Sequence, residues 1–177
     1  MMTTSLLRRA AILGLACALA ACSRDASTPA SNAGTPATAN KPTASTAPTW
    51  IDHGASACDT YLTPAVVGEI LKKPEGHSKR LAAQSCNFET PDFSSINITL
   101  TPGGVAVLDA HMPYLSDVSP LAGVGDKAVR TASGIEAAKG ADRICSVDVM
   151  PPFAAKISGD ALAQKLGAIC NQLLALP

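Results

Sequence analysis

Six cysteines are the residues best able to do chemistry in this 177-residue chain: Cys17, Cys22, Cys58, Cys86, Cys145 and Cys170. A thiol can be acylated, can pair in a disulfide, can bind a metal ion or can act as a nucleophile. No Cys-x-x-Cys or Cys-x-x-His spacing occurs, which argues against a zinc site and against a redox-active pair. Cys17 lies in an N-terminal apolar run, Cys22 follows that run directly, and the other four cysteines lie in the remainder of the chain.

The N-terminal run has the layout of a secretory signal. Arg8 and Arg9 precede the apolar residues 10–21, and Leu19-Ala20-Ala21 leads directly to Cys22. A basic start, an apolar core of roughly 7–15 residues and small residues before the cleavage site are typical of such signals. The apolar run would span about 18 Å as a helix, well short of the ~30 Å hydrocarbon core of a bilayer. This length argues against a permanent membrane span.

Leu19-Ala20-Ala21-Cys22 also looks like the lipobox of bacterial lipoproteins. That motif predicts a signal peptide over residues 1–21, cleavage before Cys22, and acylation of Cys22 by several chains that anchor the protein to a membrane. Cys17 would then leave with the signal peptide. Ser23 favours the outer membrane, facing the periplasm, in a host with two membranes. The alternative is an ordinary secretory signal in which Cys22 is incidental.

Residues 22–49 are predicted to be the lipidated cysteine and a disordered linker. Of the 27 residues from 23 to 49, 21 are Ala, Ser, Thr or Pro, with no apolar periodicity. Such a segment cannot bury enough surface to offset its ordering entropy. Its simplest role is a tether that holds a domain away from the membrane, and the alternatives are a partner motif or O-glycosylation.

The remaining residues, 50–177, are predicted to form a single periplasmic domain. Loss of Arg8 and Arg9 leaves 12 basic residues against 14 acidic ones, a net charge of about −2, and the sequence has no basic patch. This composition argues against nucleic-acid binding. The core must come mostly from aliphatic side chains, because the chain has only six aromatic residues, Trp50, Tyr61, Phe88, Phe93, Tyr114 and Phe153.

The first part of this domain reads as a helix, two strands and a second helix. Thr63-Pro64 is a helix start, after which Val66, Val67, Ile70 and Leu71 share one face, and Cys58 lies just before this helix. Residues 85–88 indicate a strand with Cys86 and Phe88 on one side. Residues 96–100 alternate apolar and polar, as in a half-buried strand. A helix is expected over 105–115, after the break at 102–104.

The second part reads as a three-stranded meander and a final helix. Residues 128–131 and 135–138 flank Ser133-Gly134, a hairpin signal, and a turn at 139–141 leads to a strand over 143–150. In that last strand Cys145, Val147 and Val149 share one face. An apolar stripe that includes Cys170 predicts a helix over about 160–176.

The four later cysteines are predicted to form two disulfides. An even number of cysteines in an exported chain favours pairing, and three connectivities can be drawn. Cys145 lies on the apolar face of its strand and Cys170 in the apolar stripe of the final helix, so the two meet if that helix covers the sheet. Cys58 would likewise join the first helix to Cys86. We therefore expect Cys58–Cys86 and Cys145–Cys170, each worth about 3–4 kcal/mol in the chain-entropy model.

Several motifs carry a wider resemblance. Cys58-Asp59-x-x-Leu62-Thr63, Ser85-Cys86-Asn87-Phe88, the turn Gly123-Val124-Gly125-Asp126-Lys127-Ala128 and Lys139-Gly140 make residues 55–177 similar to families of uncharacterised bacterial envelope lipoproteins. The resemblance implies an α+β fold, an antiparallel sheet with packed helices. It carries no activity, and the pair Cys145 and Cys170 departs from the commonest pattern of those families.

No group of residues indicates an active site. Gly123, Gly125 and Asp126 lack the Gly-Lys-Ser/Thr of a P-loop and the third glycine of a dinucleotide fingerprint, so a tight turn closed by Asp126 is expected. His53 lies near the linker, His77 lies in a polar loop, and His111 does not share a helix face with Asp109. No metal site, no cofactor and no catalytic residue are predicted.

The sequence therefore favours a non-enzymatic binding or accessory module of the cell envelope. Its expected partners are the membrane, through the lipid on Cys22, and an envelope protein, peptide or glycan. The alternative is a periplasmic hydrolase or an inhibitor-type effector, with a site assembled from distant residues such as His111, Asp126 and Lys127.

Overall fold

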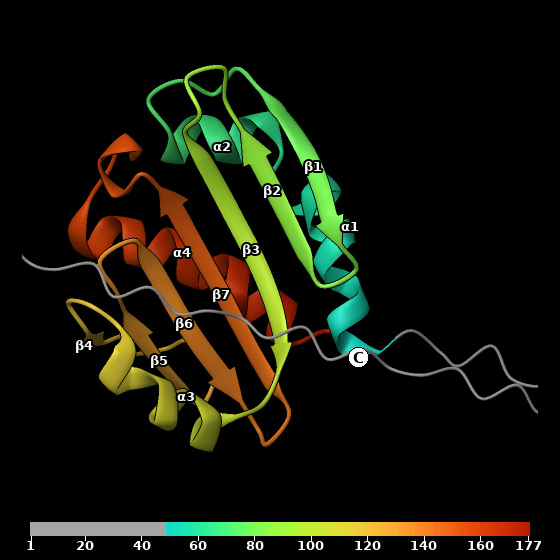
Figure 1. Cartoon of the computed structure of the whole chain (residues 1–177), viewed down its shortest axis with the longest axis vertical. Coiled ribbons are helices and arrows are strands. Elements are labelled where there is room, and N and C mark those ends of the chain that lie inside the picture. Colours follow the sequence, from blue (N-terminus) through green and yellow to red (C-terminus); the bar gives the residue numbers. More distant parts are fainter. Residues whose placement is uncertain (1–48) are drawn as a thin grey trace, which may run out of the picture. The chain divides into compact units, whose positions relative to one another are not determined.

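The computed structural model describes residues 49–177; the predicted signal peptide, Cys22 and most of the predicted linker lie outside the described residues. Within that range the protein is an α+β domain with four α-helices and a seven-stranded antiparallel sheet (Figure 1). The helices are α1 (His53–Thr60), α2 (Pro64–Ile70), α3 (Val105–His111) and α4 (Gly159–Leu174). The strands are β1 (His77–Ala82), β2 (Ser85–Glu89), β3 (Ser95–Pro102), β4 (Ser119–Pro120), β5 (Lys127–Arg130), β6 (Gly134–Lys139) and β7 (Arg143–Met150). Three short 3-10 helices are η1 (Trp50–Asp52), η2 (Met112–Tyr114) and η3 (Pro152–Ala154).

The sheet is built from two meanders that meet at its centre. The strand order is β1-β2-β3-β7-β6-β5-β4, so β1 to β3 form one meander and β4 to β7 form the other. The two long strands β3 and β7 pair along their whole length, from Ser95 opposite Met150 to Pro102 opposite Arg143. We call residues 50–102 the N-terminal half of the domain and residues 103–177 the C-terminal half.

One face of the sheet carries the main core. Helices α1, α2 and α4 lie behind the sheet in Figure 1, and α3 lies in front of β5 and β6. The main core contains the fully buried Ile96, Ile98 and Leu100 of β3 and Val147 and Val149 of β7. A second, small cluster around Leu108 of α3 covers part of the other face. Most of that other face is polar and half-buried, because the alternate residues of β3 and β7 are Asn, Thr, Ser and Asp.

Local sequence signals account for most of these elements. The Thr63 hydroxyl accepts the amide N–H of Val66, and Pro64 occupies the first turn of α2, as expected for a helix start. The alternation of buried and half-buried residues in β3 and β7 matches the predicted strands. Helix α4 ends within two residues of the expected boundary and buries Leu166, Cys170 and Leu173 against the sheet.

Both predicted disulfides are confirmed. Cys58 bonds Cys86 with a Cα–Cα distance of 5.3 Å, and Cys145 bonds Cys170 with a Cα–Cα distance of 5.7 Å. Cys58 precedes α2, as expected, but it also lies inside an additional helix, α1, which the sequence did not predict and whose small residues Gly54 and Ala57 are buried.

Two further expectations need correction. His77 does not lie in a loop: it begins β1, an edge strand whose side chains are almost all exposed. The helix expected over 105–115 ends at His111, and the chain continues as the 3-10 helix η2, because Pro113 cannot donate the next helical hydrogen bond. No helix among residues 49–177 is long and apolar enough to cross a membrane.

Candidate functional site

Three large apolar side chains are exposed at one end of the sheet. Phe93 is 81% exposed, Phe153 is 80% exposed and Met150 is 45% exposed. The backbone segments that carry them meet at this end, because Ser95, which begins β3, pairs with Met150, which ends β7. Phe93 precedes Ser95 by two residues and Phe153 follows Met150 by three, so all three residues belong to segments at the same end of the sheet. We call Phe93, Met150 and Phe153 the aromatic end.

Phe93 is held in an unfavourable backbone conformation by the turn between β2 and β3. The Phe93 amide donates to the Thr90 carbonyl at 2.9 Å, and the Thr90 amide donates to the Ser94 carbonyl at 2.8 Å. Pro91, Asp92 and Phe93 thus form a three-residue loop whose last residue has φ +63°. Loops of this kind favour glycine at that position, because a side chain there costs about 1–2 kcal/mol. The chain therefore displays an aromatic ring at a local cost in stability.

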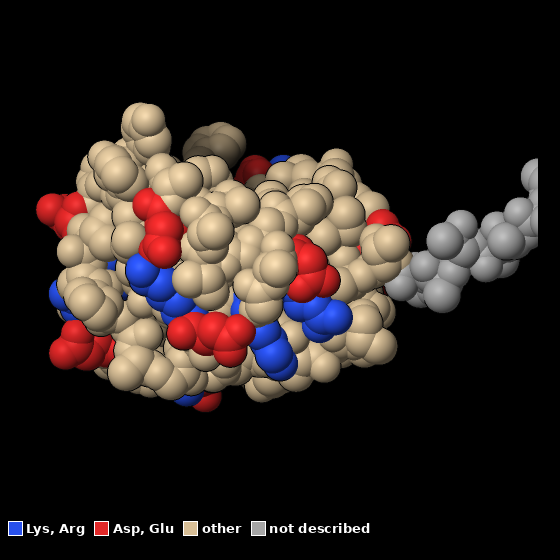
Figure 2. Space-filling view, turned by 90° about the horizontal axis from the view of Figure 1, so that it is seen from below, with Lys and Arg blue, Asp and Glu red and all other residues tan. Residues whose placement is uncertain are grey.

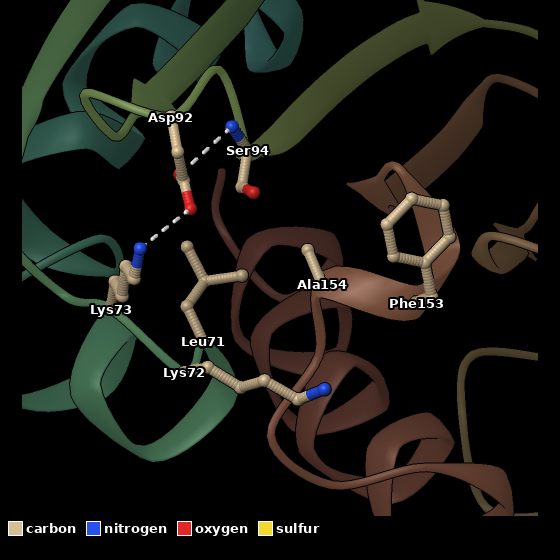
Figure 3. Close-up of a pocket in the computed structure, with 7 residues that line it drawn as sticks. All are labelled: Leu71, Lys72, Lys73, Asp92, Ser94, Phe153 and Ala154. Carbon is tan, nitrogen blue, oxygen red and sulfur yellow. Dashed lines mark hydrogen bonds and ion pairs between the residues drawn. The ribbon is translucent and has the colours of Figure 1, made fainter.

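A shallow pocket of about 210 Å³ lies beside this turn (Figure 3). Leu71 and Ala154 form its apolar floor, and Phe153 stands on one side. The other lining residues are Lys72, Lys73, Asp92 and Ser94. Backbone hydrogen bonds hold the two sides together: the Lys72 amide donates to the Ala154 carbonyl at 3.4 Å, and the Lys156 amide donates to the Ile70 carbonyl at 2.6 Å. The pocket is therefore built across the N-terminal and C-terminal halves of the domain.

The charges around the pocket do not balance. The Thr90 hydroxyl, the Ser94 amide and the Lys73 ammonium, 3.6 Å away, stabilise the Asp92 carboxylate and lower its pKa below the ordinary value. No carboxylate in residues 49–177 lies within ion-pair distance of Lys72. Two lysines and one carboxylate leave the rim with an excess of one positive charge.

The N-terminal segment joins the domain at the opposite end of the sheet. The Trp50 indole donates to the Leu173 carbonyl at 2.6 Å, and the Arg143 guanidinium lies 5.6 Å from the centre of the Trp50 ring. Arg143 begins β7 and Met150 ends it, so about 23 Å of strand separates the two ends. Figure 2, seen from below, shows basic and acidic side chains interspersed, without a large patch of one sign.

The predicted turn residues have a structural role. Gly123 has φ +79° and Gly125 has φ +55°, and the Asp126 carboxylate accepts the amide N–H of Gly140 at 2.8 Å. The Asn171 side chain of α4 accepts the amide N–H of Gly125 at 2.9 Å and donates to the Gly123 carbonyl at 2.7 Å. This turn therefore fastens the start of β5 to α4.

The polar residues considered for a distant catalytic site have separate partners. His111 lies 3.4 Å from Glu136, Lys127 pairs with Asp109, and Asp126 belongs to the turn described above. His53 begins α1, and His77 begins β1. Within the described part of the chain, no three His, Cys, Asp or Glu side chains are grouped so as to hold a metal ion.

A second, polar hollow of about 270 Å³ lies on the open face of the sheet, between η2 and the β5–β6 hairpin. Its lining includes Glu136, Ser146 and Asp148, with the highly exposed Tyr114 at its side. Burial raises the pKa of Asp148, and a hydrogen bond from the Ser133 hydroxyl at 2.7 Å partly opposes this shift.

Searches with the whole chain find no match among protein-family models, curated proteins or solved structures. The site therefore rests on geometry alone. The aromatic end was not predicted from the sequence, because residue type alone does not distinguish an exposed phenylalanine from one in the core. The one usable signal was Thr90-Pro91-Asp92-Phe93, which is a turn sequence with phenylalanine where glycine is expected.

Proposed function

We propose that this protein is a lipid-anchored binding module of a bacterial cell envelope and that it binds an envelope protein or peptide through its aromatic end. The observation that carries the proposal is Phe93, an aromatic ring 81% exposed at a backbone position that disfavours any side chain. Strained backbone positions of this kind cluster at binding and catalytic sites, which supports a functional role for this turn. Phe153 is also exposed, and the pocket beside it is lined in part by Asp92 and Ser94, the two chain neighbours of Phe93.

The arrangement of the domain supports this role. The segment that would carry the lipid on Cys22 enters at Trp50, and the aromatic end lies at the far end of β7. A domain attached in this way presents its aromatic end away from its point of attachment. The two disulfides suit a small domain in an oxidising compartment, because each restricts the unfolded chain.

The anchor is tested by replacing the acylated cysteine. Cys22→Ser removes the only thiol that the predicted signal peptidase site would expose for lipid attachment. We expect the wild-type protein in the membrane fraction after alkaline washing and mass spectrometry to find acyl chains on Cys22. Normal acylation and membrane retention of the Cys22→Ser variant would contradict the anchor.

The binding surface is tested by photo-crosslinking in intact cells of the host. A photoreactive phenylalanine analogue is placed at Phe153, and a matched control carries it at Tyr114, which is 87% exposed but lies outside the aromatic end. We expect a discrete adduct with an envelope protein from position 153 and not from position 114. An identical adduct pattern from both positions, or no adduct from position 153, would contradict this surface.

A further inference from the structure

The pocket at the aromatic end is sized for part of a partner. Its volume of about 210 Å³ is below the roughly 300–1,000 Å³ typical of pockets that enclose a whole small molecule. Its floor, Leu71 and Ala154, is apolar, and the Phe153 ring offers a large exposed apolar surface beside it. One large apolar side chain from a partner would fill this space and cover Phe153.

The rim of the pocket adds an electrostatic requirement. Asp92 already accepts hydrogen bonds from Thr90 and Ser94 and lies 3.6 Å from Lys73. Lys72, on the same rim, has no carboxylate within ion-pair distance among residues 49–177. A carboxylate from a partner could pair with Lys72 and balance the charge of the rim, whereas a basic group would be repelled by the excess positive charge.

We infer that the aromatic end binds a protein segment that inserts one large apolar side chain into the pocket and places a carboxylate against Lys72. This inference rests on the proposed function and names the chemistry of its partner. A segment fits better than an anionic membrane surface, since basic clusters that recognise anionic lipids contain roughly four to eight lysines or arginines. Here only Lys72 and Lys73 line the pocket, and Asp92 offsets one of them.

The test is a selection of random dodecapeptides displayed on phage against the full-length protein in phosphatidylcholine nanodiscs. We expect the enriched peptides to contain Asp or Glu within a few residues of a large apolar residue. The best peptide is then synthesised, and its dissociation constant is measured by fluorescence anisotropy against the wild-type protein and three variants. The variants are Lys72→Glu, Phe153→Ala and the control Lys139→Glu, an exposed lysine at the opposite end of the sheet.

Lys72→Glu should weaken peptide binding at least tenfold, and Lys139→Glu should change it less than twofold. A peptide with its acidic residue changed to lysine should bind the Lys72→Glu variant more tightly than it binds the wild type. If Phe153→Ala abolishes binding and Lys72→Glu does not change it, the inferred contact between Lys72 and a partner carboxylate is wrong, and the proposed binding function stands. If Phe153→Ala also leaves binding unchanged, both fail. Enrichment of basic peptides, or of none, overturns the inference.

Discussion

Two substitutions of Phe93 separate the free energy of its backbone strain from the free energy that burial of its ring contributes. The ring is 81% exposed, so the 19% that is covered corresponds to roughly 40 Å² and about 1 kcal/mol of apolar burial. Phe93→Ala removes that burial and keeps the side chain at φ +63°. Phe93→Gly removes the same burial and also relieves about 1–2 kcal/mol of backbone strain, less about 0.4–1 kcal/mol for the more flexible unfolded chain.

We therefore expect Phe93→Ala to lower the free energy of unfolding by about 1 kcal/mol and Phe93→Gly to be about 1 kcal/mol more stable than Phe93→Ala. Urea unfolding followed by the fluorescence of Trp50 measures both, because Trp50 is the single tryptophan and is buried. Both variants should bind the selected peptide equally weakly. A Phe93→Gly variant no more stable than Phe93→Ala would refute the reasoning that the ring is displayed at a cost.

Three further predictions concern stability. Replacing Cys145 and Cys170 together by serine should lower the free energy of unfolding by about 3.5 kcal/mol for a 25-residue separation, measured by urea titration. Burial raises the pKa of Asp148 in the native state above its ordinary value of 3.8. At a pH between these two pKa values, the native state retains a proton that the unfolded state has lost. The free energy of unfolding therefore falls as the pH rises through this range. Asp148→Asn should therefore be more stable than the wild type at pH 7, and this difference should vanish as the pH falls below 3.8; an unchanged pH profile would contradict it. Gly123→Ala should lower the free energy of unfolding by about 1 kcal/mol, because only its positive φ opposes a side chain. Gly125→Ala should lower it further, because its Cβ would also lie 2.4 Å from the Ala138 carbonyl oxygen, and thermal unfolding measures both variants.

The elements that the sequence predicted are those whose side chains alternate between the core and the solvent. Strands β3 and β7, helix α4 and the Cys145–Cys170 disulfide follow from the alternation of apolar residues in the strands and the apolar stripe of the helix. This reasoning succeeds because burial on one face imposes a period of two on a strand and of 3.6 on a helix.

The elements that were missed lack such a pattern. Helix α1 packs through small residues: a Cβ on Gly54 would lie 2.1 Å from the Gln84 backbone, so close approach of the chain, rather than apolar periodicity, selects its sequence. Strand β1 pairs through its backbone, and nearly all of its side chains are exposed. The aromatic end combines a turn, Phe93, with a segment 60 residues later, Phe153, and only the pairing of β3 with β7 brings them together.

The pocket lies between the two halves of the domain, so binding there affects how firmly the halves are held together. Cys58–Cys86 lies wholly in the N-terminal half and Cys145–Cys170 wholly in the C-terminal half, so no disulfide of the described domain joins the two. The pocket is lined by Leu71 of one half and by Phe153 of the other. A segment bound there would touch both, and its binding free energy would add to the free energy that holds them together. Binding of the partner would thus reversibly stabilise the contact between the two halves, which neither disulfide of the described domain crosslinks.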